Sequence, residues 1–507
     1  MDNLLVFAIV AAHFAVVLVI GWYSYRASLS TPEDYFMSSR TLGTVVLIIS
    51  VYATNMTAFY MIGIPGIAYH KGIGVYGFVA FGTAIITPAL YYLVGYRAWL
   101  LGKSRGYMTQ PELYGKRWGS DAVSITFFLF LLVFTVPYCC VSLIGGGVAV
   151  TMMTKGAIPY GMAVVCILSV VVIYVLIGGM RGTAWVNVYQ GLFFMIAGVL
   201  VFFLLGAKLG GFSEITGKVL AEKPSLMVRE GNFTPRQWLS YLFISPLSVI
   251  VFPQVFMKLL AGRTAGGLKR LVVSYPLIVL VTWPPVIFIG IWGAYVHPGL
   301  AGKASDAVLP WMAGNYLPAY LCGAVLAGIL AALMSSIDAM LLSLSTMLTR
   351  DILGRYVPGV VRGREVAVGR IFMLLLSLLV ASIALVRPGS IFSVATFAFN
   401  GYSVAVPMMI GTLIWKRATK YGALASLVIP ALLVPVYQFT DMLSWSTFGF
   451  SYNIPLLLLS VFLFVTVSLL TAKEDDPHRE GFFEVLDNVF GKKDRSARVG
   501  SNAGPPQ

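Results

Sequence analysis

The stretch "LAALMSSIDAMLLSLSTMLTRDI", residues 330–352, combines an apolar front with side chains that could bind a cation. At roughly 100° per residue on a helix, Ala332, Ser335 and Ser336 share one arc, and Asp338 lies beside that arc. A hard cation such as Na+ takes oxygen ligands, and two hydroxyls one turn beyond a backbone carbonyl supply three of them. Serines in membrane helices also serve as packing or back-bonding residues, so the pattern alone leaves both interpretations open.

Composition defines the setting of these residues. The chain has 507 residues, of which 58% are hydrophobic and only 11% charged, and its mean hydropathy is +0.86. Apolar runs of roughly 20 residues recur along its length, and they are about twice as long as barrel strands. The sequence therefore predicts an all-α polytopic membrane protein. Its start lacks a basic region and a cleavage site, so we expect a first spanning helix rather than a signal peptide.

Polar breaks between the apolar runs predict about 13 spanning helices. Their expected ranges are 4–25, 43–66, 73–96, 122–152, 157–178, 185–206, 237–257, 271–296, 312–347, 368–386, 391–415, 422–440 and 452–472.

The net charge of +15 reflects membrane topology rather than nucleic-acid binding, because the basic residues lie between hydrophobic segments and form no single patch. If the N-terminus is outside, most of the 35 Lys and Arg fall in inner connections and the tail. We therefore expect a multi-pass protein of the inner or plasma membrane with a cytoplasmic C-terminus. Its partners are the lipid bilayer and a small solute, with no nucleic acid and no obligatory protein partner.

Motifs for catalysis are missing from the sequence. The four cysteines lie in apolar segments, the four histidines are scattered, and neither a Walker loop nor a GxSxG sequence occurs. We predict that the protein is not an enzyme.

Two of the predicted helices carry interruptions. One is polar at 53–57 and is followed by Pro65, and the other is interrupted at 245–248 and carries Pro246 and Pro253. Breaks survive in a bilayer where the backbone lines a protein-enclosed cavity, and paired breaks five segments apart are typical of inverted-repeat transporters. Proline and glycine also kink membrane helices without function, but the pair favours a binding site. Carbonyls freed near Ala53 and Met56 could join the serine cluster.

Asp338 is the only acidic residue that we place well inside a helix, and an intramembrane carboxylate is a functional candidate. It could supply charge near a cation, carry a proton, or cap a polar network between helices. Coupling to H+ therefore stays open beside coupling to Na+.

The chain resembles the sodium:solute symporters, whose members share a LeuT-like core of two inverted five-helix repeats. The resemblance covers roughly residues 30–430. It rests on the segments "DYFMSSRTLG", "IGIPGIAY", "YVLIGGMRGTAWVNVYQG", "FPQVFMKLLAGR", "AALMSSIDAMLLSLSTMLTRDI" and "TLIWKRATKYGALASL".

The resemblance implies a Na+ site and a coupling path. The Na+ ligands would be the carbonyls of Ala53, Met56 and Ala332 and the hydroxyls of Ser335 and Ser336.

Three further positions bear on the ion path. Arg40 matches an arginine linked to inner-side coupling, although it also fits a positive-inside anchor. Asn55 and Asn187 stand where many relatives carry aspartates, so Na+ affinity or the exit path of the ion is expected to differ.

The solute should bind where the two helix breaks face each other, since helix N-termini favour anionic groups. The residues expected to line this place are Asn55, Thr57, Phe59, Ser248 and Asn400. We expect a small carboxylate-bearing solute, namely a monocarboxylate, an amino acid or a pantothenate-like acid.

The predicted organisation follows from these elements. Residues 1–42 form the first helix and an inner loop, 43–206 the first repeat, 207–236 an outer loop, 237–415 the second repeat, 416–472 two further helices and 473–507 a cytoplasmic tail. The predicted function is Na+-coupled symport by alternating access. The alternatives are an H+-coupled symporter that uses Asp338 and a membrane sensor built on a transporter fold.

Overall fold

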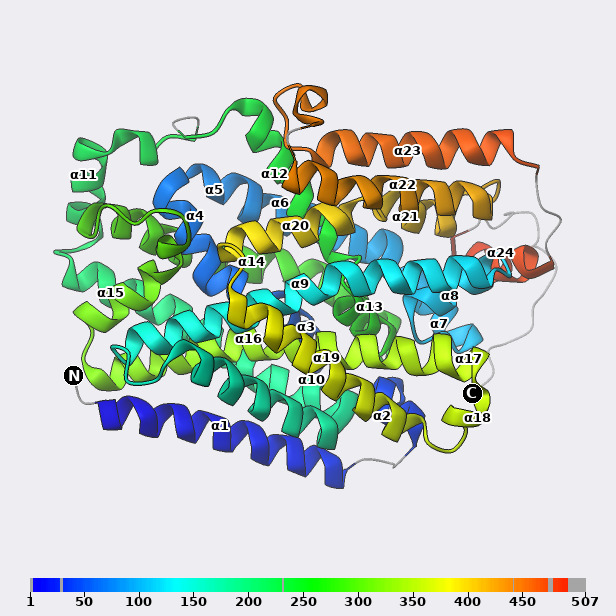
Figure 1. Ribbon diagram of the computed structural model, residues 1–507, viewed down its shortest axis with the longest axis horizontal. Helices are drawn as coiled ribbons and strands as arrows, with labels where there is room; N and C mark the ends of the chain where they lie inside the picture. Colours follow the sequence, from blue (N-terminus) through cyan, green and yellow to red (C-terminus); the bar gives the residue numbers. More distant parts are fainter. Residues whose placement is uncertain (1–2, 28–30, 230–231, 441, 473–476, 491–507) are drawn as a thin grey trace, which may run out of the picture.

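The computed structural model describes residues 3–27, 31–229, 232–440, 442–472 and 477–490, and in these ranges the chain is built from helices (Figure 1). The only bridge of β type among them is an isolated one between Leu42 and Gly262. The all-α prediction is therefore confirmed.

The long helices run nearly parallel or antiparallel along the longest axis of the molecule (Figure 1). They are α1 (Asn3–Arg26), α9 (Asp121–Met153), α10 (Tyr160–Lys208), α14 (Ala265–Val296), α16 (Ala319–Met347), α19 (Glu365–Val386), α22 (Lys420–Phe439) and α23 (Asn453–Leu470), together with the span that α20 (Ile391–Ser403) and α21 (Val406–Ile414) form jointly. A further span, Gly74–Arg105, consists of α5 (Gly74–Tyr76), η3 (Gly77–Phe81), α6 (Gly82–Leu90), η4 (Tyr91–Gly95) and α7 (Tyr96–Arg105).

Shorter helices connect or extend these spans. They are α2 (Pro32–Met37), η1 (Ser38–Arg40), α8 (Gln110–Arg117), α11 (Phe212–Glu222), η5 (Pro224–Leu226), η6 (Gly302–Ala307), α15 (Val308–Tyr316), η7 (Leu348–Leu353), α17 (Gly354–Tyr356), α18 (Pro358–Val361), η8 (Ser444–Thr447) and α24 (Pro477–Phe490). Local sequence signals set where several helices of the chain begin. For example, Thr234 and Gln237 form a capping box, which satisfies backbone N–H groups at the start of the second broken helix.

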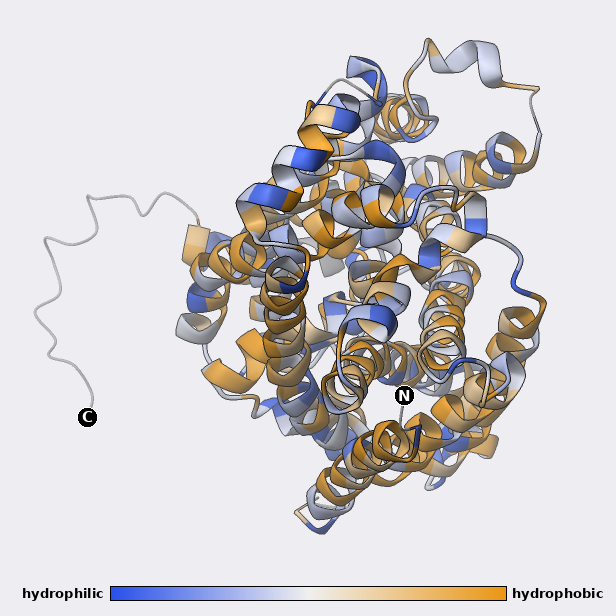
Figure 2. Ribbon diagram, turned by 90° about the vertical axis from the view of Figure 1, so that its left-hand side faces the viewer, coloured by the Kyte–Doolittle hydropathy of each residue, from blue (hydrophilic) through white to orange (hydrophobic). Residues whose placement is uncertain are grey.

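Burial identifies α16 as the centre of the bundle. Its most apolar stretch is 100% buried, whereas that of α1 is 22% buried and those of α19 and α23 are 28% buried. Seen along the helices, most of the ribbons are predominantly hydrophobic (Figure 2). The exposed apolar side chains of the outer helices suit lipid, because a bilayer solvates apolar surface. The serine-rich segment of α16 is thus shielded from both lipid and water.

The number of spans differs from the prediction. Among the described residues, ten helices are long and apolar enough to cross a membrane, or up to 12 if each of two bent pairs counts as one span. The helix α10 counts once, although Gly179 within it is non-helical (φ 52°, ψ −149°). The predicted ranges 157–178 and 185–206 are the two halves of α10, which explains why the sequence suggested one more span. The count of 13 and the two five-helix repeats stay predictions.

Both interrupted helices are present, but the second break lies further along the chain than predicted. The first pair bends by 53° and consists of α3 (Thr44–Asn55) followed by η2 (Phe59–Gly63) and α4 (Ile64–Lys71). The second pair bends by 48° and consists of α12 (Pro235–Val249) and α13 (Pro253–Leu260). The expected break at 245–248 is wrong, because Pro246 lies inside α12. The chain opens just before Pro253 instead, since proline disfavours helical geometry in the preceding residue and fits the start of a helix.

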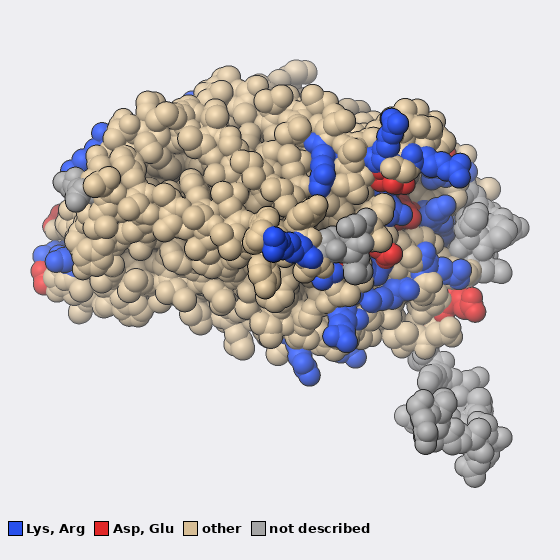
Figure 3. Space-filling model, turned by 90° about the horizontal axis from the view of Figure 1, so that it is seen from below, with Lys and Arg blue, Asp and Glu red and all other residues tan. Residues whose placement is uncertain are grey.

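Basic residues gather at one end of the bundle, which we call the basic end. It carries Arg105, Arg117 and Lys416 around the tail helix α24. Figure 3 shows Lys and Arg concentrated toward this end on the face in view. On this face a broad surface with few charged residues separates it from the opposite end, as expected for a protein that crosses a bilayer.

Candidate functional site

The first helix break frees the backbone groups of a cation site. The helix α3 ends at Asn55, Met56 is extended (φ −87°, ψ 102°), and helical geometry resumes at Phe59. Helix α9 packs closely against the break because Gly145 has no side chain: a Cβ at this position would meet the Cβ of Ala58 at 2.4 Å. Because α3 ends at Asn55, the carbonyl groups of its last turn lose part of their hydrogen-bond partners within the helix, although they stay buried.

The two α16 serines face these carbonyls. Ser335 Oγ lies 3.0 Å from the Ala53 carbonyl oxygen and 2.9 Å from that of Ala332. Ser336 Oγ lies 3.0 Å from the Met56 carbonyl oxygen and 3.4 Å from that of Ala332. The structure thus brings all five residues of the expected Na+ site together, and each is at most 1% exposed.

The chemistry of this cluster fits a hard monovalent cation. It offers three carbonyl and two hydroxyl oxygens and no charged ligand, which is the donor type that alkali and alkaline-earth cations prefer. A serine hydroxyl that donates to a carbonyl can rotate its hydrogen away and present a lone pair to an ion. The two hydroxyls can therefore donate hydrogen bonds to the three carbonyl oxygens, or all five oxygens can coordinate Na+.

Asp338 lies on the next part of α16, and three donors surround its carboxylate. Tyr174 of α10 donates its hydroxyl to Oδ2 at 3.0 Å, Asn187 Nδ2 approaches Oδ1 at 3.4 Å, and the Ala339 N–H points to Oδ1. Asn187 Nδ2 also lies 3.0 Å from Thr54 Oγ1 and 3.0 Å from the Ser335 carbonyl oxygen. Asn187 therefore connects the first broken helix to the serine segment.

Sequence reasoning missed Lys258, which is fully buried in α13. Its ammonium donates to Thr54 Oγ1 and to the Ser50 carbonyl oxygen, the latter at 3.3 Å. The signal was present in "VFPQVFMKLLAG", where a single lysine interrupts an apolar run. An intramembrane lysine deserves the same functional suspicion as an intramembrane aspartate.

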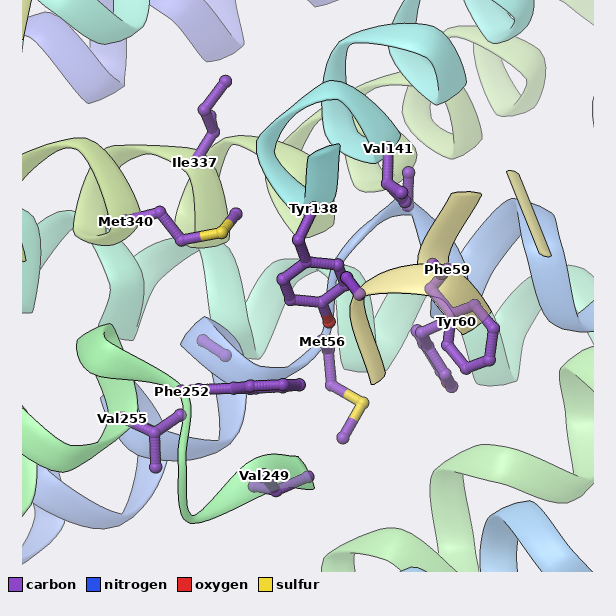
Figure 4. Packing of buried hydrophobic residues seen from close by; sticks show 14 of the residues in the cluster. Met56, Phe59, Tyr60, Tyr138, Val141, Val249, Phe252, Val255, Ile337 and Met340 are labelled. Carbon is purple, nitrogen blue, oxygen red and sulfur yellow. The ribbon is translucent and has the colours of Figure 1, made fainter. Parts of the chain in front are cut away.

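The two helix breaks face each other across an aromatic cluster formed by Phe59, Tyr138, Phe252, Phe399 and Tyr402. The ring centroids of Tyr138 and Phe252 are 4.9 Å apart, those of Phe59 and Phe399 5.1 Å, and those of Phe252 and Tyr402 5.0 Å. Figure 4 shows Tyr138 reaching down from α9 between Met56 and Phe252, with its hydroxyl toward the first break.

Three of the residues expected to contact a solute join this cluster. Phe59 belongs to it, Thr57 Oγ1 lies 3.5 Å from the Tyr138 hydroxyl, and Ser248 Oγ donates to the Phe399 carbonyl oxygen at 2.8 Å.

The other two expected solute contacts point to different neighbours. Asn55 donates its amide to Tyr275 of α14. The amide of Asn400 is buried near Tyr452 and makes no hydrogen bond of normal geometry with the described residues. Phe252 and Phe399 were missed because aromatic residues are so frequent in this chain that sequence alone does not single them out.

Arg40 lies at the basic end and not among the cation ligands. It is buried, donates to the Tyr107 carbonyl oxygen at 2.8 Å and approaches Glu33 at 3.8 Å. Burial lowers the pKa of its guanidinium. Its contacts tie the loop before α3 to the end of α7, so it can act on the site only through the helices that it fixes.

The chain matches one protein family over most of its length. A sequence model described as "Sodium:solute symporter family" matches residues 35–429. The osmoregulated proline transporter OpuE of Bacillus subtilis is 26% identical over 492 residues, which covers 95% of this chain and 98% of that protein. A sodium/proline symporter of Haemophilus influenzae is 26% identical over 520 residues, covering 97% and 98%.

Two solved structures share the fold. A Na+-coupled sialic acid symporter, in a substrate-bound outward-open state, superposes with a TM-score of 0.76 at 19% identity and covers 92% of this chain and 98% of its own. A nucleobase-cation-symport-1 family transporter in a closed conformation gives a TM-score of 0.57 at 14% identity, covering 90% and 100%.

Proposed function

Because the chain belongs to the sodium:solute symporter family, we propose that it uses Na+ to accumulate a small amino acid, and that proline is the first substrate to test. Na+-coupled transport of a small solute across the plasma membrane follows from the family. The residues that bind Na+, the solute itself and the orientation in the membrane are the parts that we propose.

One observation carries the proposal: two serine hydroxyls of α16 meet the carbonyls of Ala53, Met56 and Ala332 at 2.9 to 3.4 Å. The proposed Na+ would lie among these five oxygens and join the first broken helix to the centre of the bundle. Na+ would then favour the conformation in which both parts meet, and its loss on the other side would weaken solute binding through reciprocal linkage. Residues 43–206 and 237–415 would be the two repeats that move against each other.

The aromatic cluster supports an amino acid with an apolar side chain. Tyr138, Phe252 and Phe399 contact one another. If they separate to admit a solute, they would offer ring faces to apolar carbon atoms and to an ammonium group, which rings attract through cation–π contacts. The helical segments that begin at Phe59 and Pro253 would favour a carboxylate with their N-terminal ends. Proline combines these three features, and two of the relatives described above are named as proline transporters.

The proposed orientation places the basic end in the cytoplasm, because positively charged residues concentrate on the inner side of membrane proteins. The N-terminus would then be outside and the tail helix α24 inside.

Coupling to H+ through Asp338 is the alternative to be tested alongside. Asp338 is fully buried near the serines, which favours a role in coupling. However, Tyr174, Asn187 and the Ala339 N–H all donate to it, which favours the carboxylate form and a purely electrostatic role.

The experiment is uptake of radiolabelled proline by the purified full-length protein in liposomes under a Na+ gradient and, separately, under a proton gradient. Lactate and pantothenate serve as competitors. We expect accumulation of proline that needs Na+, is lost in Ser335→Ala plus Ser336→Ala and is retained in Ser343→Ala, whose hydroxyl only bonds back to the Ala339 carbonyl oxygen.

Other results would change the assignment. Accumulation driven by protons and lost in Asp338→Asn would move coupling to the carboxylate. If radiolabelled lactate or pantothenate is accumulated and radiolabelled proline is not, that acid replaces proline as the substrate. Solute binding without flux under either gradient would favour a sensor.

A further inference from the structure

Lys258 is the only lysine among the buried residues that the structure describes. It lies in α13, directly after the second helix break, and its Nζ donates to two oxygens of α3, the Ser50 carbonyl and Thr54 Oγ1. Both acceptors are uncharged, and an isolated buried ammonium is costly because it loses its hydration. A negative charge nearby would offset that cost.

Asp338 supplies that charge. The Asn187 amide nitrogen and the Ala339 N–H can only donate to it, and the Tyr174 hydroxyl can donate as well, so the acceptor-only carboxylate form matches its surroundings. A chain of polar groups connects Lys258 and Asp338, so opposite charges on the two side chains would attract each other. Thr54 Oγ1 accepts from Lys258 and from Asn187 Nδ2, and the same Asn187 nitrogen reaches Asp338.

This pair lies next to the proposed Na+ site. Asn187 Nδ2 lies 3.0 Å from the carbonyl oxygen of Ser335, and Thr54 is the chain neighbour of Ala53. One carboxylate and one ammonium cancel in net charge, while the five proposed Na+ ligands are neutral. A single bound Na+ would thus bring the whole centre to one positive charge.

We propose that Lys258 is a built-in cation that takes the place of a second transported ion, so that the protein binds one Na+ per chain. The inference rests on the proposed Na+ site at Ser335 and Ser336. Without the ammonium, Thr54 Oγ1 and the Ser50 carbonyl oxygen lose their cationic partner. The Asp338 carboxylate, linked to Thr54 through Asn187, then leaves this place with a net negative charge. Such a place suits a second Na+.

The test counts Na+ ions bound by the purified full-length protein in detergent, using equilibrium binding of radiolabelled Na+ without solute. We expect one Na+ per chain in the wild type, two in Lys258→Met, and one in Lys258→Arg, which keeps the charge. The double variant Lys258→Met plus Asp338→Asn removes both charges and should return to one. Two ions in the wild type, or one ion bound with unchanged affinity in Lys258→Met, would overturn the inference.

A second measurement covers the case in which Lys258→Met folds poorly. Thermal unfolding of the two single variants and the double variant forms a double-mutant cycle. We expect each single variant to lower Tm in the absence of Na+, because one buried charge is left alone, and the double variant to recover most of that loss. Additive losses would show that the two charges do not form a pair and would refute the proposal.

The same assay separates this inference from the proposed function. Loss of all Na+ binding in Ser335→Ala plus Ser336→Ala, together with one ion in both the wild type and Lys258→Met, contradicts only the role of Lys258. Absence of Na+ binding in the wild type contradicts both.

Discussion

The Ser335 hydroxyl lies 3.0 Å from the Ala53 carbonyl oxygen, although 282 residues of chain separate them. This contact joins the central helix α16 to the end of α3, where the first break begins. An ion held between such distant segments responds to any movement of one against the other, which is the property that a coupling site needs.

Removal of either site hydroxyl should weaken Na+ binding. We expect Ser335→Ala and Ser336→Ala each to raise the Na+ concentration for half-maximal uptake by roughly 10- to 100-fold, because a hydrogen-bond-strength contact to a charge contributes about 1.5–3 kcal/mol. Thr346→Ala on the same helix is the control, since its hydroxyl bonds back to the Leu342 carbonyl oxygen. An equal effect of the control would indicate general helix damage.

The close approach of α9 to the first break should not tolerate a methyl group. In Gly145→Ala the new Cβ would meet the Ala58 Cβ at 2.4 Å, so the break must shift. We expect the maximal uptake rate to fall at least about tenfold, since overpacking costs roughly 1–3 kcal/mol and displaces site carbonyls. Gly217→Ala, which has open space around it, should retain the wild-type rate. Normal uptake by Gly145→Ala would contradict a rigid break.

Restoring an aspartate at 187 should make stability depend more strongly on Na+. Asn187→Asp replaces a donor by an acceptor 3.4 Å from Asp338 and 3.0 Å from the Ser335 carbonyl oxygen. In Na+-free buffer we expect the variant to have a lower Tm and a free energy of unfolding smaller by about 1–3 kcal/mol. Its Tm should then rise more steeply than that of the wild type as Na+ is added. Equal Na+ dependence in variant and wild type would show that position 187 does not sense the ion.

Asp306 predicts a pH dependence at the end opposite the basic end. Burial raises the pKa of this carboxyl to about 7, although the Ile391 N–H donates to it at 3.1 Å and Arg387 lies 3.8 Å away. Between about pH 4 and pH 7 the folded protein keeps a proton that the unfolded chain releases. Stability should therefore fall as pH rises through this window and level off above it.

The variant Asp306→Asn tests this expectation. It keeps an acceptor for the Ile391 N–H but cannot ionise. Its Tm should therefore depend much less on pH between pH 5 and pH 8 than the Tm of the wild type, and the variant should be the more stable protein at pH 8. Between pH 4 and pH 7 and above, ionisation of Asp306 should lower the free energy of unfolding of the wild type by at most roughly 4 kcal/mol. Parallel pH profiles of the two proteins would exclude Asp306 as the source.

Much of the architecture was predictable because it depends on local patterns. Apolar runs and polar breaks gave nearly all spans, and helical periodicity placed Ala332, Ser335 and Ser336 on one face. The second break was misplaced because Pro246 and Pro253 look alike in sequence, and only packing decides which one starts a helix. Lys258 and the pair Phe252 and Phe399 were missed, since their importance comes from partners on other helices.

The turn inside α10 depends on a single glycine. Its halves meet at Gly179 without a loop: Arg181 pairs with Asp34 at this end, whereas Tyr160 bonds to Ala384 and Phe202 stacks on Trp292 toward the other. A Cβ at Gly179 would lie 2.6 Å from the Tyr35 carbonyl oxygen. A side chain at position 179 would push Tyr35 away from the turn, and with it the neighbouring Asp34 that pairs with Arg181. The direction in which the second half of α10 continues therefore depends on one residue that has no side chain.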